Sequence, residues 1–231
     1  MKYDVLLLDA DDTLFDFAKC ERAALQNTLR GAGLPFSQDI YETYSAINLS
    51  FWKMLERGEI DRESLRTKRF VVLAAQLGLS LDADAINRRY TEALAEQHFL
   101  IEGARPFVQQ AAQFYRLYIV TNGMAYSQEK RLAASGLLPF INDVFISEKI
   151  GAAKPDKAFF RHVFSAIPAF DSTKALLIGD SLSSDIAGGI NAGIDTCWFN
   201  PTAAVNHTSW QPVYEVRTLQ EVLTFDKVLT L

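Results

Sequence analysis

Five short runs of β-forming apolar residues recur along this chain of 231 residues, and they constrain its fold more than any other feature. They lie at residues 5–8, 117–121, 144–146, 175–178 and 196–199. Their apolar residues are consecutive rather than alternating, which is typical of parallel strands covered on both faces. Segments with helical periodicity lie between them, near residues 104–115, 125–135, 155–166 and 185–192. The alternation of strand and helix predicts an α/β fold with a doubly wound parallel sheet.

The alternation stops between residues 16 and 98, where no segment has the pattern of a good strand. Residues 40–57, 61–77 and 83–97 have helical periodicity, and glycines at 31, 33 and 78 mark breaks between helical segments. We therefore expect an all-helical domain, 16–98, inserted after the first strand. An α/β core domain would comprise residues 1–15 and 99–231.

The charge balance restricts the class of partner. The chain has 23 Lys and Arg against 28 Asp and Glu, a formal net charge of −5, and no basic cluster. A nucleic-acid polymer is therefore not expected as a partner, because its phosphates must be neutralised by several cations. A small phosphorylated metabolite remains compatible with this composition.

The chain also has few features of a membrane or secreted protein. No apolar run reaches the roughly 18 residues that span a bilayer, and the N-terminal run is shorter than the roughly 7 residues of a signal-peptide core. The two cysteines, Cys20 and Cys197, are too far apart to indicate a metal knuckle or a disulfide framework. We expect a cytoplasmic protein without a membrane partner, either a monomer or a homodimer.

Polar residues follow four of the predicted strands. Because the carboxyl ends of parallel strands meet at one edge of a sheet, we expect these side chains to converge on a ligand site there. Each group alone is compatible with an ordinary turn or helix cap, but four successive strand ends make coincidence a poor explanation. The residues are Asp9, Asp11 and Thr13, then Thr121, Asn122 and Gly123, then Lys154, and finally Gly179, Asp180 and Asp185.

The three aspartates at positions 9, 11 and 12 raise an electrostatic question, because carboxylates this close repel one another. In an extended segment residues i and i+2 face the same way, so Asp9 and Asp11 would share the site and Asp12 would point away from it. Together with Asp180 they require a hard cation, and Mg²⁺ binds to few protein oxygens plus water and phosphate. The sequence therefore predicts a Mg²⁺ site.

These residue types suit phosphoryl transfer. A carboxylate beside a metal ion can attack phosphorus and form an aspartyl-phosphate intermediate. A neighbouring Asp can protonate the leaving oxygen and then deprotonate the attacking water. The Thr121 hydroxyl, the Asn122 amide and the Lys154 ammonium suit the charged phosphoryl oxygens.

Four motifs in the same order resemble those of the haloacid dehalogenase-like (HAD) superfamily of phosphohydrolases, over essentially the whole chain. They are "LLLDADDTL", "YIVTNG", the Lys of "GAAKPD" and "GDSLSSD". The resemblance implies that Asp9 is the nucleophile and Asp11 the general acid/base. It also implies that Asp9, the Asp11 backbone carbonyl and Asp180 hold Mg²⁺, with Asp185 just outside these ligands. The helical insert resembles the small helical cap of this superfamily.

Within the superfamily, "DADDTLFDF" followed by "AINLSFW" looks most like the pyrimidine 5′-nucleotidases. This resemblance implies a pyrimidine nucleoside monophosphate as substrate. Phe15, Phe17, Phe51 and Trp52 could provide a stacking surface for its base, although for each of them alone a place in the core of the cap is the favoured interpretation. Arg66, Lys68 and Arg69 could reach a substrate, but they are expected on a solvated helix face.

Three alternatives remain beside the nucleotidase. A sugar-phosphate phosphatase or phosphomutase of the same superfamily would keep all four motifs. A true dehalogenase needs no metal and lacks the second Asp, so Asp11 and Asp180 disfavour it. A non-enzymatic phosphoacceptor signalling domain also gathers acids, Thr and Lys at sheet ends, but it lacks the helical insert and carries its phosphorylated Asp on a later strand.

Overall fold

The computed structural model describes residues 2–225 and contains, within them, an all-parallel six-stranded sheet in the order β3-β2-β1-β4-β5-β6. The strands are β1 (Val5–Leu8), β2 (Arg116–Thr121), β3 (Asp143–Ile146), β4 (Ala175–Gly179), β5 (Asp195–Phe199) and β6 (Tyr214–Val216). All five predicted strands are present, which confirms the predicted fold class.

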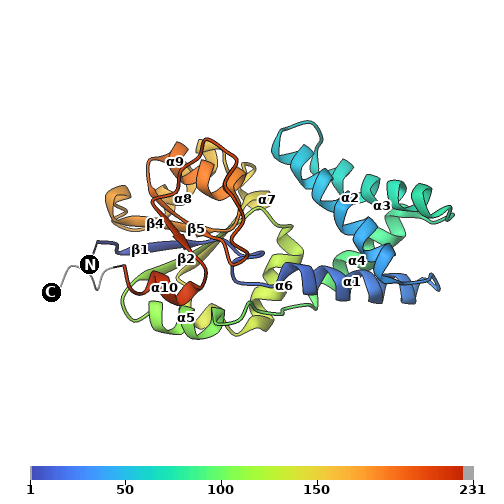
Figure 1. The fold of residues 1–231 in the computed structure, drawn as a ribbon, viewed down its shortest axis with the longest axis horizontal. Coiled ribbons are helices and arrows are strands. Elements are labelled where there is room, and N and C mark those ends of the chain that lie inside the picture. The colour runs from blue at the N-terminus through green and yellow to red at the C-terminus, as the bar shows by residue number, and fades with distance from the viewer. Residues whose placement is uncertain (1, 226–231) are drawn as a thin grey trace.

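Helices cover both faces of the sheet (Figure 1). One face is covered by α5 (Ala104–Ala111), α6 (Ala125–Ser135) and α10 (Leu219–Val222). The other is covered by α7 (Ser147–Ile150), α8 (Lys157–Ala166) and α9 (Ala187–Ala192). None of the helices in the described part of the chain combines the length and the apolar character needed to cross a membrane.

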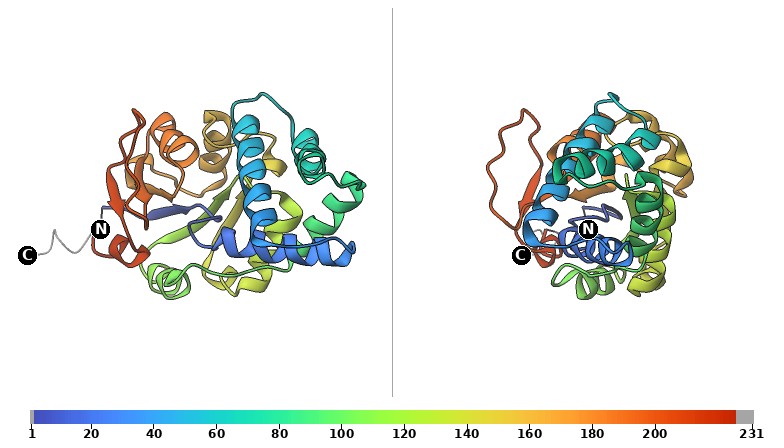
Figure 2. Two further views of the ribbon diagram at one scale, coloured as in Figure 1. Left: turned by 45° about the vertical axis from the view of Figure 1, so that its right-hand side comes forward. Right: turned by 90° about the vertical axis from the view of Figure 1, so that its right-hand side faces the viewer.

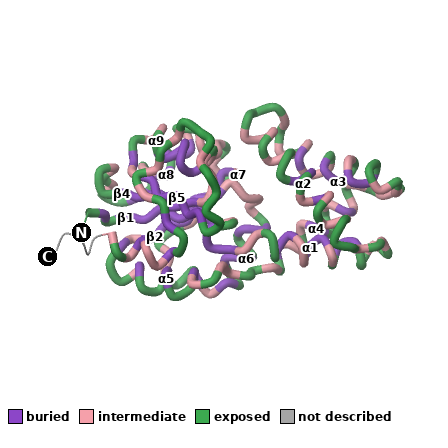
Figure 3. The backbone as a smooth tube through the Cα atoms, in the orientation of Figure 1, coloured by how far each residue is buried: buried purple, intermediate pink, exposed green. Residues whose placement is uncertain are grey.

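The central strand β1 shows why the apolar runs are continuous. Leu6 and Leu8 pack on one side of the sheet with Phe107 of α5, whereas Val5 and Leu7 pack on the other side with α8. Successive strand residues point to opposite faces, and here both faces are covered, so each position must be apolar. The strands accordingly form the buried centre of this part of the molecule (Figure 3).

A second group of helices lies between β1 and α5 in the sequence and forms the helical insert. It consists of α1 (Phe17–Gly31), α2 (Gln38–Glu56), α3 (Arg62–Leu77) and α4 (Ala83–Ala95). The insert has its own hydrophobic cluster, in which Tyr44, Phe70 and Tyr90 pack ring against ring. It lies beyond one end of the sheet, away from the two chain termini (Figures 1 and 2). The domain boundaries at residues 16 and 98 stay a prediction.

Each helix of the insert begins at a residue whose side chain caps it. Asp16, Ser37, Asp61 and Asp82 accept hydrogen bonds from backbone N–H groups of the first turn of α1, α2, α3 and α4, respectively. Such caps satisfy N–H groups that have no partner inside the helix. The starts of these helices are therefore specified locally by the sequence.

The structure differs from the sequence-based expectations at several elements. Strand β6 was missed because it is a short edge strand in which only Val216 is buried, so it has no continuous apolar run. Helix α1 was also missed. The helix expected over 185–192 is divided into a π-helical turn, Leu182–Ile186, and α9. The helix expected from 155 begins two residues later, after the Asp156 cap, and the helix expected over 104–115 ends at Ala111.

Candidate active site

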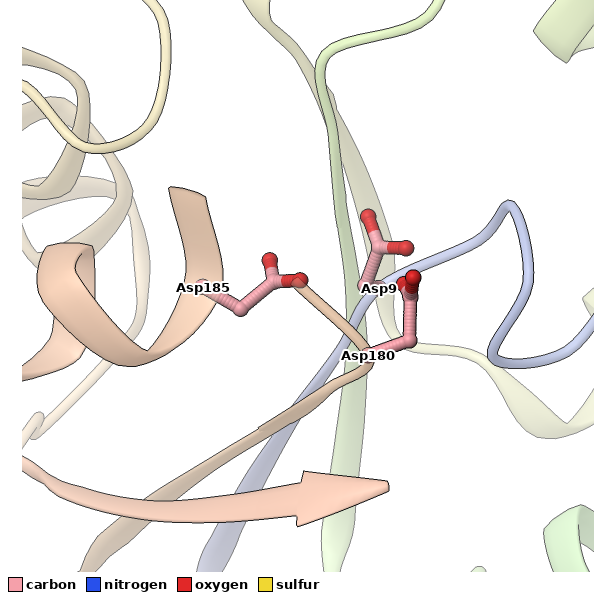
Figure 4. Close-up of side chains that lie close together, drawn as sticks. All are labelled: Asp9, Asp180 and Asp185. Atoms are coloured by element: carbon pink, nitrogen blue, oxygen red, sulfur yellow. The ribbon is translucent and has the colours of Figure 1, made fainter. Parts of the chain in front are cut away.

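Three carboxylates meet at the carboxyl edge of the sheet. Asp9 directly follows β1, Asp180 directly follows the neighbouring strand β4, and Asp185 comes from the π-helical turn after it. The Asp9 N–H donates to the Ile178 carbonyl at 2.9 Å, which continues the pairing of the two strands up to the site. One carboxylate oxygen from each aspartate lies within 4.8 Å of the others (Figure 4).

The backbone around Asp180 and Asp185 is held closely. The Trp198 indole donates to the Asp180 carbonyl at 2.7 Å, and the Ser181 N–H donates to Oδ2 of Asp185 at 3.1 Å. A Cβ at Gly179 would lie 2.3 Å from the Asp185 carboxylate, so only glycine allows this carboxylate to approach the strand end.

Lys154 joins two of these carboxylates. Its Nζ donates to Oδ1 of Asp9 at 2.5 Å, to Oδ1 of Asp185 at 2.7 Å and to the Val120 carbonyl at 2.8 Å, and the side chain is 1 % exposed. Burial lowers the pKa of Lys154, but the Asp185 and Asp9 carboxylates outweigh burial and raise it above its ordinary value. The group is therefore an ammonium ion at neutral pH.

The acidic cluster nevertheless carries more negative than positive charge. Three carboxylates against the one ammonium of Lys154 leave two negative charges if all are ionised. Burial raises the pKa of Asp9 to about 7 although Lys154 opposes this, and burial together with Asp9 raises the pKa of Asp180 well above its usual range. A divalent cation would remove this imbalance, and an all-oxygen ligand set suits a hard cation such as Mg²⁺.

Asp11 has different partners, both from helix α6. Arg131 Nη1 donates to Oδ1 of Asp11 and Gln128 Nε2 donates to Oδ2, each at 2.6 Å. Arg131 is 1 % exposed, and its guanidinium carbon lies 4.4 Å from the centre of the Phe15 ring. Sequence reasoning missed both partners, although their spacing of three residues places them on one face of a helix.

Two side chains at the end of β2, those of Thr121 and Asn122, form hydrogen bonds with backbone groups. The Thr121 hydroxyl accepts the Gly123 N–H at 3.1 Å. The Asn122 side chain pairs with the backbone of Lys154, donating to its carbonyl and accepting its N–H, both at 2.9 Å. The Asn122 amide, expected to face phosphoryl oxygens, is thus engaged in positioning Lys154.

A cavity of about 340 Å³ connects this edge of the sheet with the helical insert, a size within the range of small-molecule sites. Asp9, Asp11, Thr121, Asn122, Lys154, Asp180 and Asp185 line it from the sheet, and Phe17, Glu21, Ser45, Asn48 and Trp52 line it from α1 and α2. The structure therefore brings these seven predicted residues to one cavity, whereas Thr13, which is 0 % exposed, does not line it.

Only some of the expected aromatic residues reach this cavity. Phe17 and Trp52 line it. Phe15 does not, because it is 0 % exposed and belongs to the hydrophobic core beside α5 and α6. Phe51 packs against the hydrophobic cluster of the insert. The two that reach the cavity come from different helices, α1 and α2.

Asp12 lies differently from the expectation. The backbone at this residue has φ 59°, so the chain leaves the extended conformation that would have turned the side chain away. Asp12 lines the same cavity as Asp9 and Asp11, and its carboxylate accepts the Phe17 N–H at 3.2 Å. The alternation of side-chain directions that an extended segment would give therefore does not continue to Asp12.

Comparison with known proteins places the chain in a family. Residues 3–193 match the haloacid dehalogenase-like hydrolases. The chain is 41% identical over 221 residues to the HAD-hydrolase YfnB of Bacillus subtilis (strain 168), covering 96% of this chain and 94% of that protein. A crystal structure of YfnB bound to magnesium shares the fold with a TM-score of 0.93, at 39% identity and covering 100% of both chains.

Two further relatives match over nearly their whole length. The chain is 41% identical over 224 residues to the pyrimidine 5′-nucleotidase PynA of Streptococcus pneumoniae (strain ATCC BAA-255 / R6), covering 96% of this chain and 94% of that protein. It is 31% identical over 222 residues to the pyrimidine 5′-nucleotidase YjjG of Escherichia coli (strain K12), covering 96% and 97%. With this extent of match, the chain belongs to the haloacid dehalogenase-like hydrolases and is an enzyme of that family.

Proposed function

We propose that this enzyme hydrolyses phosphomonoesters with the help of Mg²⁺, and that its preferred substrates are pyrimidine nucleoside 5′-monophosphates. The observation that carries the proposal is a single cavity that has the acidic cluster at one end and two aromatic side chains, Phe17 and Trp52, on the insert side. A nucleotide could place its phosphoryl group at the acidic cluster and its base beside Phe17 and Trp52. The names of the relatives PynA and YjjG support the choice of substrate.

Asp9 is the proposed nucleophile. Its carboxylate oxygen attacks phosphorus and forms an aspartyl phosphate, while the P–O bond to the leaving alcohol breaks. Asp11, in the same cavity, is proposed to give a proton to the leaving oxygen and later to take one from the water that hydrolyses the aspartyl phosphate, for which its carboxylate must exchange a hydrogen bond from Arg131 or Gln128 for one to the substrate. Lys154 and the Thr121 hydroxyl stabilise the charge on the phosphoryl oxygens.

The acidic cluster is the proposed Mg²⁺ site. The Asp9 and Asp180 carboxylates and the Asp11 backbone carbonyl would hold the ion, with Asp185 close enough to support or join them. Bound there, the ion would supply the positive charge that the cluster lacks and would attract the phosphoryl oxygens. Asp9 is then kept ionised, as a nucleophile must be.

We propose that the helical insert, residues 16–98, acts as a cap domain over a core formed by residues 1–15 and 99–231. Several of its contacts with the edge of the site are polar. Arg62 donates to the Asn122 carbonyl at 3.3 Å and to the Ser147 hydroxyl at 2.6 Å, and Arg66 pairs with Glu148. Such contacts can separate at little cost in water, which would allow substrate to enter and product to leave.

Lys154→Ala should lower kcat/KM for p-nitrophenyl phosphate by about 10²–10³-fold, because the charge of Asp9 and of the phosphoryl group loses its fixed counter-charge. The variant should also be less stable by about 3–5 kcal/mol, because two buried carboxylates lose their partner. Steady-state kinetics and thermal unfolding measure the two effects. Lys174→Ala, at the opposite end of β4, is the matched control, since its pair with Asp4 is exposed. A loss below threefold would remove Lys154 from the mechanism.

A phosphate-release screen tests the substrate. We expect uridine, deoxyuridine and thymidine monophosphates to exceed purine nucleotides and hexose phosphates in kcat/KM, because Phe17 and Trp52 line the cavity and are proposed to stack against a single-ring base. Trp52→Ala should reduce the advantage over hexose phosphates by about 5- to 100-fold, the scale of one base–aromatic stack. Trp210→Ala, which removes a tryptophan outside the lining of the cavity, should leave the ranking unchanged.

The same screen decides between this proposal and its alternatives. If hexose phosphates rank first, the enzyme is a sugar-phosphate phosphatase, or a phosphomutase if phosphate is transferred rather than released. If no phosphate ester is hydrolysed while a 2-haloacid is, the proposed phosphatase activity is wrong. A chain that accepts phosphate on Asp9 without turnover would be a phosphoacceptor instead.

A further inference from the structure

A buried polar network lies in the insert wall of the cavity. Glu21 of α1 and Asn48 of α2 both line the cavity, although each is only 2 % exposed. Asn48 Nδ2 donates to Oε1 of Glu21 at 2.7 Å, and Arg69 Nη1 of α3 donates to Oδ1 of Asn48, also at 2.7 Å. Arg69, expected on a solvated face, is 5 % exposed, and its Nη2 donates to Asn87 at 3.2 Å.

This network determines which way the Asn48 amide is oriented. A guanidinium group can only donate hydrogen bonds, so the Asn48 atom facing Arg69 must be the oxygen and the atom facing Glu21 must be the nitrogen. An amide nitrogen carries two N–H groups, and a carboxylate can accept about four hydrogen bonds. Glu21 and Asn48 therefore have more donor and acceptor positions than their mutual contact uses, and both residues line the cavity.

The charge of Glu21 is compensated within the insert. Burial raises the pKa of Glu21, whereas hydrogen bonding from Ser45 and Asn48 and the positive charge of Arg69 act in the opposite direction. A carboxylate removed from water needs such partners to stay ionised. Burial outweighs these partners, so the pKa of Glu21 is raised, but the hydrogen bond from Asn48 shows that Glu21 serves as an acceptor in this wall of the cavity.

Each residue of the polar pair lies one helical turn from an aromatic residue that also lines the cavity. On α1, Phe17 and Glu21 are four residues apart, and on α2, Asn48 and Trp52 are also four residues apart. Residues at this spacing lie one above the other on the same helix face. Each helix thus presents one aromatic and one polar group to the cavity, an arrangement that suits a flat ring with hydrogen-bonding groups on its edge.

We propose that Glu21 and Asn48 form the subsite that recognises the base, and that they select uracil and thymine. Glu21 would accept the ring N3–H, and Asn48 would donate to the carbonyl next to it. This inference rests on the proposed nucleotidase function and names the two residues that determine its specificity. Arg69 acts through Asn48 and is a positioning residue.

Cytosine fits this pair less well. It has an unprotonated N3, whose lone pair would face the Glu21 carboxylate. Guanine carries the same carbonyl beside a ring N–H as uracil, so the donor Asn48 and the acceptor Glu21 separate uracil and thymine from cytosine and not from guanine. A buried polar group without a partner disfavours binding, so a site built for one hydrogen-bonding pattern rejects the others.

The first test uses the wild-type enzyme and a modified substrate. We expect N3-methyl-UMP, which lacks the ring N–H, to have a kcat/KM about 10- to 100-fold below that of UMP, the scale of one hydrogen bond to a charged group. CMP should fall by a similar factor. Equal kcat/KM for UMP and N3-methyl-UMP would overturn the inference.

The second test uses Glu21→Gln. If the glutamine oxygen keeps the hydrogen bond from Asn48, its NH₂ group faces the ligand and can donate to cytosine N3. The UMP/CMP ratio of kcat/KM should therefore fall by about tenfold or more, the scale of one charged hydrogen bond. Glu42→Gln, the same change at an exposed site on α2, should keep the wild-type ratio. Thermal unfolding shows whether each variant is folded.

The outcomes separate this inference from the proposed function. A uniform loss on UMP, N3-methyl-UMP and CMP in Glu21→Gln would assign Glu21 a purely structural role and overturn the inference. If wild type prefers UMP to hexose phosphates but ignores N3 methylation, the nucleotidase proposal stands and the base subsite is wrong. If wild type prefers hexose phosphates, both fail. Should Glu21→Gln not fold, the comparison of UMP with N3-methyl-UMP decides alone.

Discussion

Asp9→Asn should lower kcat for p-nitrophenyl phosphate by about 10⁴-fold or more, the scale seen when a member of a catalytic unit is removed. An amide is a poor nucleophile and a poor metal ligand, and Asp9 is proposed to serve in both roles. No neighbouring carboxylate can easily replace Asp9 as the nucleophile, because Lys154 fixes the position of Asp9 by donating to its Oδ1 at 2.5 Å. Phosphate release under saturating substrate measures the effect.

The chain offers a matched control for this substitution. Asp4, just before the opposite end of β1, pairs with Lys174 at the surface, with both side chains about half exposed. Exposed pairs contribute little to stability, so Asp4→Asn should retain wild-type turnover. If Asp9→Asn keeps more than a few per cent of the activity while folded, the nucleophile must be another group.

Removal of divalent cations by exhaustive chelation should bring turnover of the same substrate to background, and added Mg²⁺ should restore it. The physical reason is the charge of the site: Asp9, Asp180 and Asp185 face one ammonium, and a phosphate ester adds further negative charge. Without a cation, either the carboxylates take up protons, which disables the nucleophile, or the substrate is repelled. Titration of the chelated enzyme with Mg²⁺ measures the recovery.

Two controls accompany the chelation experiment. Chelator saturated with Mg²⁺ beforehand should leave turnover unchanged, which excludes a direct effect of the chelator. Mg²⁺ should also raise the unfolding temperature of wild type, because a ligand that binds the native state stabilises it. Asp180→Asn should reduce this rise. Full turnover after thorough chelation would contradict the proposed mechanism.

Much of the α/β fold was predictable because its signals are local. Each buried parallel strand must be apolar on both faces, so five of the strands appear in the sequence as continuous runs. β6 carries no such signal, because only one side of this edge strand is covered. The helical insert was recognisable from periodicity, although α1 within it was missed.

The location of the acidic cluster was also predictable from the sequence. Parallel strands place the residues that follow them at one edge, so Asp9, Lys154 and Asp180 had to lie near one another once the sheet was parallel. The adjacency of β1 and β4 brings Asp9 and Asp180 still closer. This part of the site follows from strand direction and strand order.

The partners of these residues were decided by tertiary packing alone. Asp11 is held by Gln128 and Arg131, which lie 117 and 120 residues further along the chain. Phe15 enters the hydrophobic core whereas Phe17, two residues later, reaches the cavity. No local pattern distinguishes these outcomes.

The base subsite shows the same limit. Glu21, Asn48 and Arg69 come from three helices, and in the sequence each resembles an ordinary polar residue on a helix surface. They become a network only because the three helices pack together and exclude water from the groups between them. Strand ends converge because of chain direction, which a sequence pattern carries, whereas contacts between helix faces depend on how those helices are packed, which only the folded structure determines.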